Sequence, residues 1–447
     1  MTGQPSLVRA VGTLGLAASI VNVTIGGGIF RLPALIALTL HAAAPLAFLV
    51  CAAAMGLIVV CFAEAGKRVD LTGGPYAYVE VAFGRFSGFL AGVLVWLLGT
   101  FAVAAVSTVF ADSVGALAPG LSGPAGRAIV LVLTFALLGA VNIRGVREGT
   151  RLNAVATAAK LLPLALLIVA GVFRIRPAHL ALAGPVAAGT VARASILLIF
   201  AFSGVESALV PSGEIEDVRR TVPRALLLAM LVITGFYLAI QIVAQGVLGP
   251  DLEGASTPLA LAATRIFGPW GGTLLLTGAV VSMFGYVSGM TLAVPRALYA
   301  FARDGFLPRA LARIHPRFRT PHLAIATQSA VVCLLAITSG FERLAILANL
   351  VTLLLYAGCC LAAWELARRD PSPDGVSTMR RWRVTIVPFA ACAAIAWLLT
   401  SITWREWRVT FMMLGVATLV FLLTAVIPSP GRGTSSPFRR RARRGRA

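Results

Sequence analysis

Apolar runs long enough to cross a lipid bilayer follow one another along almost the whole of this 447-residue chain. A membrane-spanning helix needs about 20 mostly apolar residues. The runs lie near residues 11–38, 43–66, 85–118, 127–143, 152–173, 191–212, 222–248, 271–302, 321–340, 342–367, 384–402 and 406–428. Only 12% of the residues are charged, which is too few to cover a soluble protein of this size. We therefore predict an all-α membrane protein with about 12 transmembrane helices.

The formal net charge of +21 comes from basic residues that gather in alternate loops. Arginine and lysine are concentrated after the second, fourth, sixth, eighth and tenth runs and in the C-terminal tail. Because cytoplasmic loops carry such an excess, both termini are predicted to face the cytoplasm. No basic face is interleaved with exposed aromatic residues, so the charge does not indicate nucleic-acid binding.

This pattern divides the chain into four segments. Residues 1–10 are a cytoplasmic N-terminus, 11–367 a core of ten helices, 368–428 two additional transmembrane helices, and 429–447 a disordered basic cytoplasmic tail. The six cysteines lie in apolar runs without metal-ligand spacing, and the four histidines are scattered. The sequence therefore predicts neither a metal site nor a cofactor.

The first apolar run is interrupted by three consecutive glycines, Gly26, Gly27 and Gly28. Each glycine destabilises a helix by roughly 1 kcal/mol relative to alanine, and the small residues of tight helix contacts are spaced four apart instead. We predict an unwound segment, which a membrane tolerates only where the backbone is buried in protein or lines a wet cavity.

A second interruption lies in the sixth run, where Ser203 and Gly204 precede the carboxylate of Glu206. A carboxylate at this depth costs about 2.5–3.5 kcal/mol on insertion scales, so it should face the protein interior. Glu206 either belongs to a binding site or only forms a hydrogen bond with a neighbouring helix, and the sequence leaves both interpretations open.

The two interruptions fall in spans one and six, as expected of two inverted five-helix repeats followed by two extra helices. Such paired interruptions are the best sequence pointer to the binding site of a transporter. The N-terminus of a half-helix offers free N–H groups and a positive dipole end, and the facing C-terminus offers free carbonyls. Together they suit a zwitterion.

Lys160 is one of two lysines among 38 lysine and arginine residues, and it lies within the fifth run. Lysine can lose its proton when it is desolvated, whereas arginine effectively cannot. We interpret Lys160 as a proton carrier. The alternative is a fixed interior cation that binds the carbonyls of a broken helix.

Six segments of the chain resemble motifs of the amino acid–polyamine–organocation superfamily, specifically of its bacterial amino-acid permeases. They are Thr24–Phe30, Gly73–Gly84, Lys160–Pro163, Phe202–Glu206, Glu214–Ala225 and Arg296–Pro308. No single segment is specific, but their order and spacing are similar to those of the family, from about Gly12 to Trp364. One departure is the missing first proline of the motif in Glu214–Ala225.

The resemblance implies a leucine-transporter-type fold, a 5+5 inverted repeat with discontinuous helices 1 and 6 that works by alternating access in the bacterial cytoplasmic (inner) membrane. The substrate carboxylate would meet the amides of Gly27 and Gly28. The amine would meet carbonyls near Thr24, Phe200 and Ser203, with Phe200 as an aromatic gate. The predicted substrate site comprises Thr24, Gly26, Gly27, Gly28, Phe200, Ser203, Gly204 and Glu206, and Lys160 is the predicted coupling residue.

The function implied is secondary active transport of an amino acid, as proton-coupled symport or exchange. A sodium-coupled symporter is an alternative, because Ser288 and Thr291 offer hydroxyls to an ion, although a charged Lys160 would compete for that space. An amino acid/amine antiporter is another, but such relatives tend to carry tryptophan in helix eight, where Met290 stands.

Other classes of protein fit the sequence less well. A non-transporting sensor would need a soluble output domain, and an enzyme would need clustered His, Asp, Glu or Cys that the spans almost lack. We expect a small-molecule amino acid, a proton (or sodium) and the lipid bilayer as partners. The sequence gives neither the amino acid, the stoichiometry nor the oligomeric state.

Overall fold

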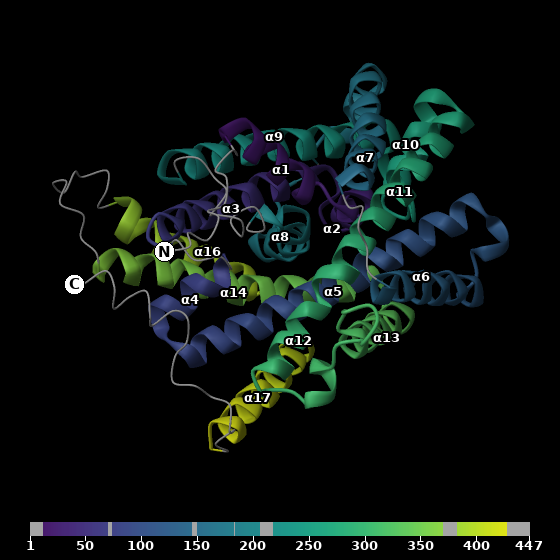
Figure 1. The fold of residues 1–447 in the computed structure, drawn as a ribbon. Helices are drawn as coiled ribbons and strands as arrows, with labels where there is room; N and C mark the ends of the chain where they lie inside the picture. The colour runs from purple at the N-terminus through teal and green to yellow at the C-terminus, as the bar shows by residue number, and fades with distance from the viewer. Residues whose placement is uncertain are drawn as a thin grey trace.

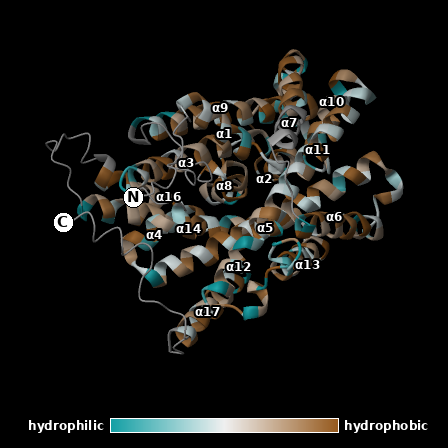
Figure 2. Ribbon diagram, in the orientation of Figure 1, coloured by the Kyte–Doolittle hydropathy of each residue, from teal (hydrophilic) through white to brown (hydrophobic). Residues whose placement is uncertain are grey.

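The computed structural model describes residues 12–69, 74–144, 150–182, 184–205, 218–369 and 382–426, and every regular element within these ranges is a helix. Seven helical segments of this part of the chain are long and apolar enough to cross a membrane, and five shorter apolar helices accompany them. Hydrophobic residues predominate along the helices, whereas hydrophilic residues gather near helix ends and in loops (Figure 2). These elements confirm the predicted all-α membrane fold.

The first half of the chain supplies five crossings, and Figure 1 shows how they are arranged. The first crossing consists of α1 (Thr13–Thr24), the 3-10 turn η1 (Gly27–Phe30) and α2 (Leu32–Leu40). The others are α3 (Ala44–Gly66), α5 (Arg85–Leu117), α6 (Pro124–Arg144) and α7 (Thr150–Gly171).

The second half repeats this order and adds two helices. Its elements are α8 (Ala188–Phe202), α9 (Val218–Leu248), α11 (Pro269–Ala293) continued by α12 (Pro295–Arg303), α13 (His322–Thr338) and α14 (Phe341–Arg369). A π-helical turn (Trp382–Ile386), α16 (Val387–Leu399) and α17 (Trp404–Val426) follow. The eighth run, predicted as one helix over 271–302, divides before Pro295 because proline has no N–H to continue the helical ladder. The predicted terminal segments 1–10 and 429–447 lie outside the described residues.

Two short helices that the sequence interpretation missed mark the inverted repeat. The helix α4 (Pro75–Phe83) precedes α5, and α10 (Pro258–Phe267) precedes α11 at the opposite end of the crossings (Figure 1). Both begin with proline, which suits a first helical turn. Both are followed by a glycine with positive φ, 88° at Gly84 and 82° at Gly268, the conformation that ends helices. A proline start and a positive-φ glycine end therefore occur at equivalent places in the two repeats.

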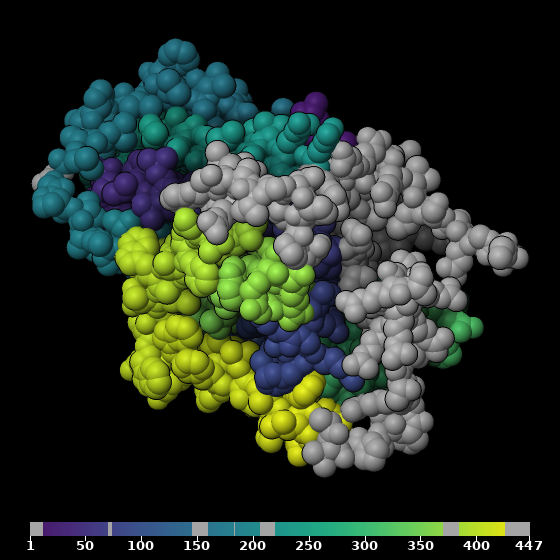
Figure 3. All heavy atoms as spheres, turned by 90° about the vertical axis from the view of Figure 1, so that its left-hand side faces the viewer, coloured from purple at the N-terminus to yellow at the C-terminus, as the bar shows by residue number. Residues whose placement is uncertain are grey.

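The centre of the molecule is formed by α8, which is seen end-on between α1, α2, α3 and α14 in Figure 1. In the most apolar stretch of α14, 78% of the residues are buried, whereas in that of α17 only 11% are buried. In Figure 3, the lime and yellow surface belongs to α16 and α17, on one side of the molecule. The last helix is thus peripheral and faces the surrounding lipid.

Candidate functional site

The first helix break is shorter than the glycine triplet predicted. The helix α1 ends at Thr24, and Ile25 (φ −71°, ψ 81°) and Gly26 (φ −101°, ψ −164°) are non-helical. Gly27 and Gly28 instead open the turn η1. The first N–H groups of a helical turn have no acceptor within it, and no backbone acceptor from elsewhere in the described chain is bonded to these two. The turn therefore presents two free N–H groups at the break.

The second break follows α8. Ser203 is extended (φ −69°, ψ 153°), and its N–H still donates to the Ile199 carbonyl at 2.8 Å. Gly204 has a φ of 106°, a conformation that side chains with a Cβ rarely adopt. The helix α8 thus ends at Phe202, as the predicted interruption requires, whereas residues 206–217, where the sixth span would resume, lie outside the described residues. Glu206 lies outside the described residues, so its predicted role stays a prediction.

The two breaks lie against each other, and Tyr237 of α9 joins them. Its Oη lies 3.0 Å from the Thr24 carbonyl oxygen and 2.9 Å from the Ala201 carbonyl oxygen, and its side chain is fully buried. One hydroxyl proton serves two carbonyls, each of which can accept a second hydrogen bond. Sequence reasoning missed Tyr237, although a tyrosine in an apolar helix signals a buried hydroxyl that needs a partner.

Lys160 connects α7 to the end of α1. Its Nζ donates a hydrogen bond to the Asn22 carbonyl at 2.5 Å, two residues before α1 ends, and the residue is only 8% exposed. The ammonium therefore sits at the negative end of the α1 dipole. Among the alternatives that the sequence left open, this contact is compatible with both a proton carrier and a fixed cation.

Side chains from three helices close tightly over the glycines of η1. A Cβ placed on Gly27 would lie 2.8 Å from Cγ1 of Val106 (α5) and 3.0 Å from Cγ of Met283 (α11). On Gly28 it would lie 2.7 Å from Cδ1 of Phe200 (α8). A side chain at either position would therefore force the neighbouring side chains to shift.

Phe200, which the sequence predicts as an aromatic gate, packs against a residue of α14. The Phe200 ring packs edge-on against the ring of Phe341, with centroids 5.4 Å apart, and both side chains are buried. Phe341 gave no signal in the sequence, because it is one apolar residue among many. The Phe200 ring therefore lies over Gly28 and is itself packed against α14.

The α2 end of the first crossing is fastened to the segment between α9 and α10. Arg31 donates from Nη1 to the Ala255 carbonyl at 2.8 Å, and the His41 ring lies 2.7 Å from the Glu253 carboxylate. On the α1 side of the break, Val23 is 41% exposed although it lies next to Gly204. The first crossing is thus tied to the segment between α9 and α10 on its α2 side, and it exposes Val23 on its α1 side.

Of the two hydroxyls considered for sodium, that of Thr291 already forms hydrogen bonds within the protein. Thr291 donates from Oγ1 to the Ser288 carbonyl at 2.9 Å and accepts from Nδ2 of Asn142 at 3.2 Å. Within the described ranges, no group of three or more His, Cys, Asp or Glu side chains is placed to hold a metal ion. None of the six cysteines forms a disulfide, and all are buried or partly buried.

The chain resembles known transporters over nearly its whole length. The profile of the family described as "Amino acid permease" matches residues 11–438. The serine/threonine exchanger SteT of Bacillus subtilis (strain 168) is 28% identical over 411 residues, 88% of this chain and 90% of the relative.

Two further relatives come from the same organism. Its methylthioribose transporter is 26% identical over 439 residues, 94% of each chain. Its branched-chain amino acid permease BcaP is 25% identical over 425 residues, 90% of each chain. The molecule with the two facing helix breaks therefore belongs to the amino acid permease family, a family of multi-pass membrane transporters and not of enzymes.

Proposed function

We propose that this chain carries out secondary active transport of a neutral amino acid by alternating access, as proton-coupled symport or as exchange. The observation that carries the proposal is the contact between the Lys160 ammonium and the Asn22 carbonyl, beside the first helix break. A titratable cation at this place links the protonation state of the protein to the position of α1.

The free N–H groups of Gly27 and Gly28 are the proposed site for the substrate carboxylate. They stand at the start of η1, where an anion is favoured by the unpaired N–H groups and the dipole. The substrate ammonium would face the carbonyls at the ends of α1 and α8. The Thr24 carbonyl accepts from Tyr237, and the Phe200 carbonyl accepts from the Ser203 hydroxyl at 3.0 Å. Each carbonyl oxygen retains capacity for another donor.

The proposal that the substrate is neutral rests on the side chains around the two glycines. Val106, Met283 and Phe200 approach Gly27 and Gly28 most closely, and none of them carries a charge or a hydrogen-bonding group. A charged substrate side chain placed among them would lose its hydration without gaining a partner. Among the relatives, SteT and BcaP are named for uncharged amino acids.

Coupling is proposed to act through Lys160. When its ammonium loses the proton, its attraction for the Asn22 carbonyl weakens, and α1 is freed to move relative to α7. A ligand or proton shifts a conformational balance only if it binds the two states unequally, and this contact supplies such a difference. Exchange without net proton movement is the second candidate, since SteT is named an exchanger.

Uptake into proteoliposomes separates these modes. A panel of labelled amino acids is offered with an imposed pH gradient, with a sodium gradient, or to vesicles preloaded with unlabelled substrate. Proton symport predicts accumulation with the pH gradient alone, and exchange predicts uptake only into preloaded vesicles. Uptake that requires sodium, or no transport of any neutral amino acid, would contradict the proposal.

The orientation is proposed from the arginine-rich alternate loops, with both termini in the cytoplasm. A reporter fused after Ala447 should be active only in its cytoplasmic form. Activity of a periplasmic reporter at the same place would contradict this orientation.

A further inference from the structure

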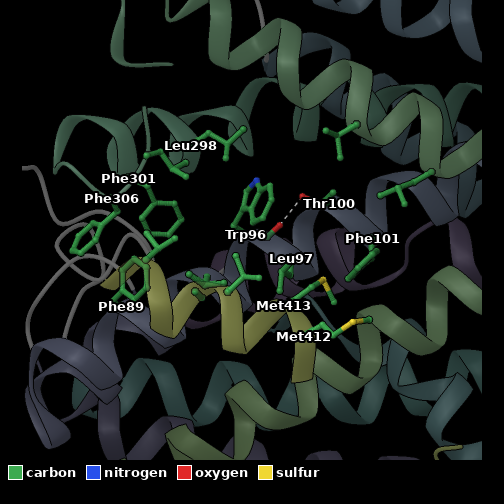
Figure 4. Close-up of a pocket in the computed structure, with 17 residues that line it drawn as sticks. Phe89, Trp96, Leu97, Thr100, Phe101, Leu298, Phe301, Phe306, Met412 and Met413 are labelled. Atoms are coloured by element: carbon green, nitrogen blue, oxygen red, sulfur yellow. Dashed lines mark hydrogen bonds between the residues drawn. The ribbon is translucent and has the colours of Figure 1, made fainter. Parts of the chain in front are cut away.

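A cavity of about 450 Å³ lies apart from the helix breaks, between α5, α12, α13 and α17. Figure 4 shows Phe89, Phe301 and Phe306 gathered at one end, Phe101 towards the other and Trp96 between them. Met412 and Met413 of α17 form a further wall. The volume is within the range of about 300–1,000 Å³ typical of small-ligand sites.

The few polar groups in the cavity wall are already paired. Trp96 donates from its indole N–H to Oε1 of Gln328 at 2.9 Å, and Nε2 of Gln328 donates to the Thr100 hydroxyl at 3.0 Å. That hydroxyl donates to the Trp96 carbonyl at 2.8 Å. Water inside a cavity needs two or more polar partners, which this wall does not offer, so the fitting occupant is hydrocarbon.

The position of the cavity identifies the source of the hydrocarbon. The cavity lies beneath α17, the least buried of the long apolar helices described, and Met412 and Val416 are both lining residues and more than 60% exposed. From Phe89 to Phe101 the cavity follows α5 for about 18 Å at 1.5 Å per residue. One leaflet of the hydrocarbon core is about 15 Å thick, so the cavity matches the length of one lipid tail.

One end of the cavity is rich in positive charge. Phe306 and Leu307 line it, and the segment 303–319 in which they lie carries five arginines against one aspartate, Asp304. Asp304 pairs with Arg303 at 3.1 Å, while Arg309 is exposed. Arg85, also exposed, begins α5 one turn before Phe89. In the orientation proposed above, this end faces the cytoplasm.

We propose that the cavity is a binding site for one acyl chain of an anionic phospholipid, whose headgroup lies against the arginines of 303–319. The acyl chain fills the space between α5 and α17, and the phenyl rings of Phe89 and Phe306 border it near the headgroup, with Phe421 packed against both rings. Phe421 lies 5.4 Å from Phe89 and 5.9 Å from Phe306 between ring centroids. The lipid thus becomes the inner packing partner of the peripheral helix α17.

Binding of the acyl chain is tested by filling the cavity with a larger side chain. The full-length protein is placed in nanodiscs of mixed phosphatidylglycerol and phosphatidylcholine, and the lipids it retains are counted by native mass spectrometry. Ala417 is buried in the cavity wall. Ala417→Phe should therefore lower lipid retention by about tenfold, the effect of losing roughly two methylene contacts. Val420→Phe, from the same wall, is a second filling variant in case the first does not fold.

Leu419→Phe is the matched control, because Leu419 lies on the same helix, is 56% exposed and does not line the cavity. It should retain lipid as the unmodified protein does. Equal retention in a folded filling variant would overturn the proposal. A protein dimer that Ala417→Phe dissociates would also overturn it, because the occupant would then be a second copy of the chain.

The proposed contact with an anionic headgroup is tested by removing positive charge from the protein. Arg303→Gln with Arg309→Gln should reduce the preference for phosphatidylglycerol over phosphatidylcholine by about fivefold for each arginine removed. Arg343→Gln, an exposed arginine at the start of α14, should leave the preference unchanged. A preference that survives the double substitution would overturn the anionic headgroup.

Discussion

The two helix breaks both contain glycine, but glycine is favoured for a different physical reason in each. At the first break, Gly27 and Gly28 do not have positive φ, but Val106, Met283 and Phe200 would have to shift to admit a Cβ. At the second break, Gly204 has room, since its Cβ would lie 3.4 Å from the nearest atom, but its φ is 106°. The first break is thus specified by packing and the second by backbone conformation.

This difference has a consequence for movement. A break that is defined by side chains packed on it can change only if those side chains move, whereas a break defined by one φ angle can serve as a hinge, because hinges absorb change at a few such residues. We therefore expect the η1 side to be the rigid part of the site and Gly204 to be its flexible joint.

The largest effect is expected at Gly28. Gly28→Ala places its Cβ 2.7 Å from Phe200, and Gly28→Leu fills the same space entirely. Because Phe341 packs against Phe200, this contact opposes a shift of the ring, and the free N–H groups are expected to lose access to the carboxylate. Gly28→Leu should abolish transport, and Gly28→Ala should lower initial uptake by about 100-fold, as misplacement by about 1 Å can. The equivalent Gly27→Leu should fail in the same way.

The control for this variant is a test of whether it folds. Gel filtration and thermal unfolding of Gly28→Leu should match those of the unmodified protein within a few degrees. Normal substrate affinity in a stable Gly28 or Gly27 variant would show that the carboxylate does not bind at η1.

Lys160 should give the next largest effect, on coupling and not on binding. Lys160→Arg keeps the positive charge near the Asn22 carbonyl but cannot release its proton, and Lys160→Met removes the charge. Both should bind substrate and fold, yet lose accumulation driven by a pH gradient. Initial uptake rates at several imposed gradients measure this. If Lys160→Arg responds to the gradient as the unmodified protein does, Lys160 is a fixed cation and coupling must lie elsewhere, with Glu206 as the first candidate.

These same residues show how much of the site could be predicted from the sequence. The glycine triplet predicted the first break because consecutive glycines oppose a helix wherever they stand. Lys160 was recognised because a charge in an apolar run is rare. Both signals are local, so neither depends on knowing the partner. The identity of the Asn22 carbonyl as that partner depends on how α1 and α7 pack, which one sequence does not fix.

What the sequence missed is non-local or short. Tyr237 and Phe341 look like ordinary residues of apolar helices until Thr24 and Phe200 are placed beside them. The helices α4 and α10, of 9 and 10 residues, are too short to form an apolar run of membrane length. Their signal was the shared ending Phe-Gly in front of a long helix, which only a comparison of the two halves would have detected.

A smaller effect is expected at the second break. Gly204→Ala introduces no clash, but it forces an alanine into a conformation that costs roughly 1–3 kcal/mol. Turnover should fall by about tenfold, which corresponds to about 1.4 kcal/mol in the barrier, while substrate affinity changes less. Single-turnover binding and steady-state uptake distinguish the two quantities. A loss of affinity as large as that of Gly28→Ala would mean that Gly204 also lies against the substrate.

The smallest effect is expected at Gly26, which stands in the first break but has neither constraint. Its φ is −101°, which other residues adopt, and a Cβ would find its nearest atoms, the Thr24 and Val23 carbonyl oxygens, at 3.8 and 4.0 Å. Gly26→Ala should therefore change uptake by no more than about twofold, in line with the ±0.5 kcal/mol typical of substitutions without a steric or polar conflict. It is the matched control for Gly28→Ala, since the same methyl group is added two residues away in the same segment. If Gly26→Ala were as damaging as Gly28→Ala, room for a side chain in this conformation would not explain why glycine is needed. The first break would then also have to adopt, in another state of the transport cycle, a backbone conformation that only glycine permits.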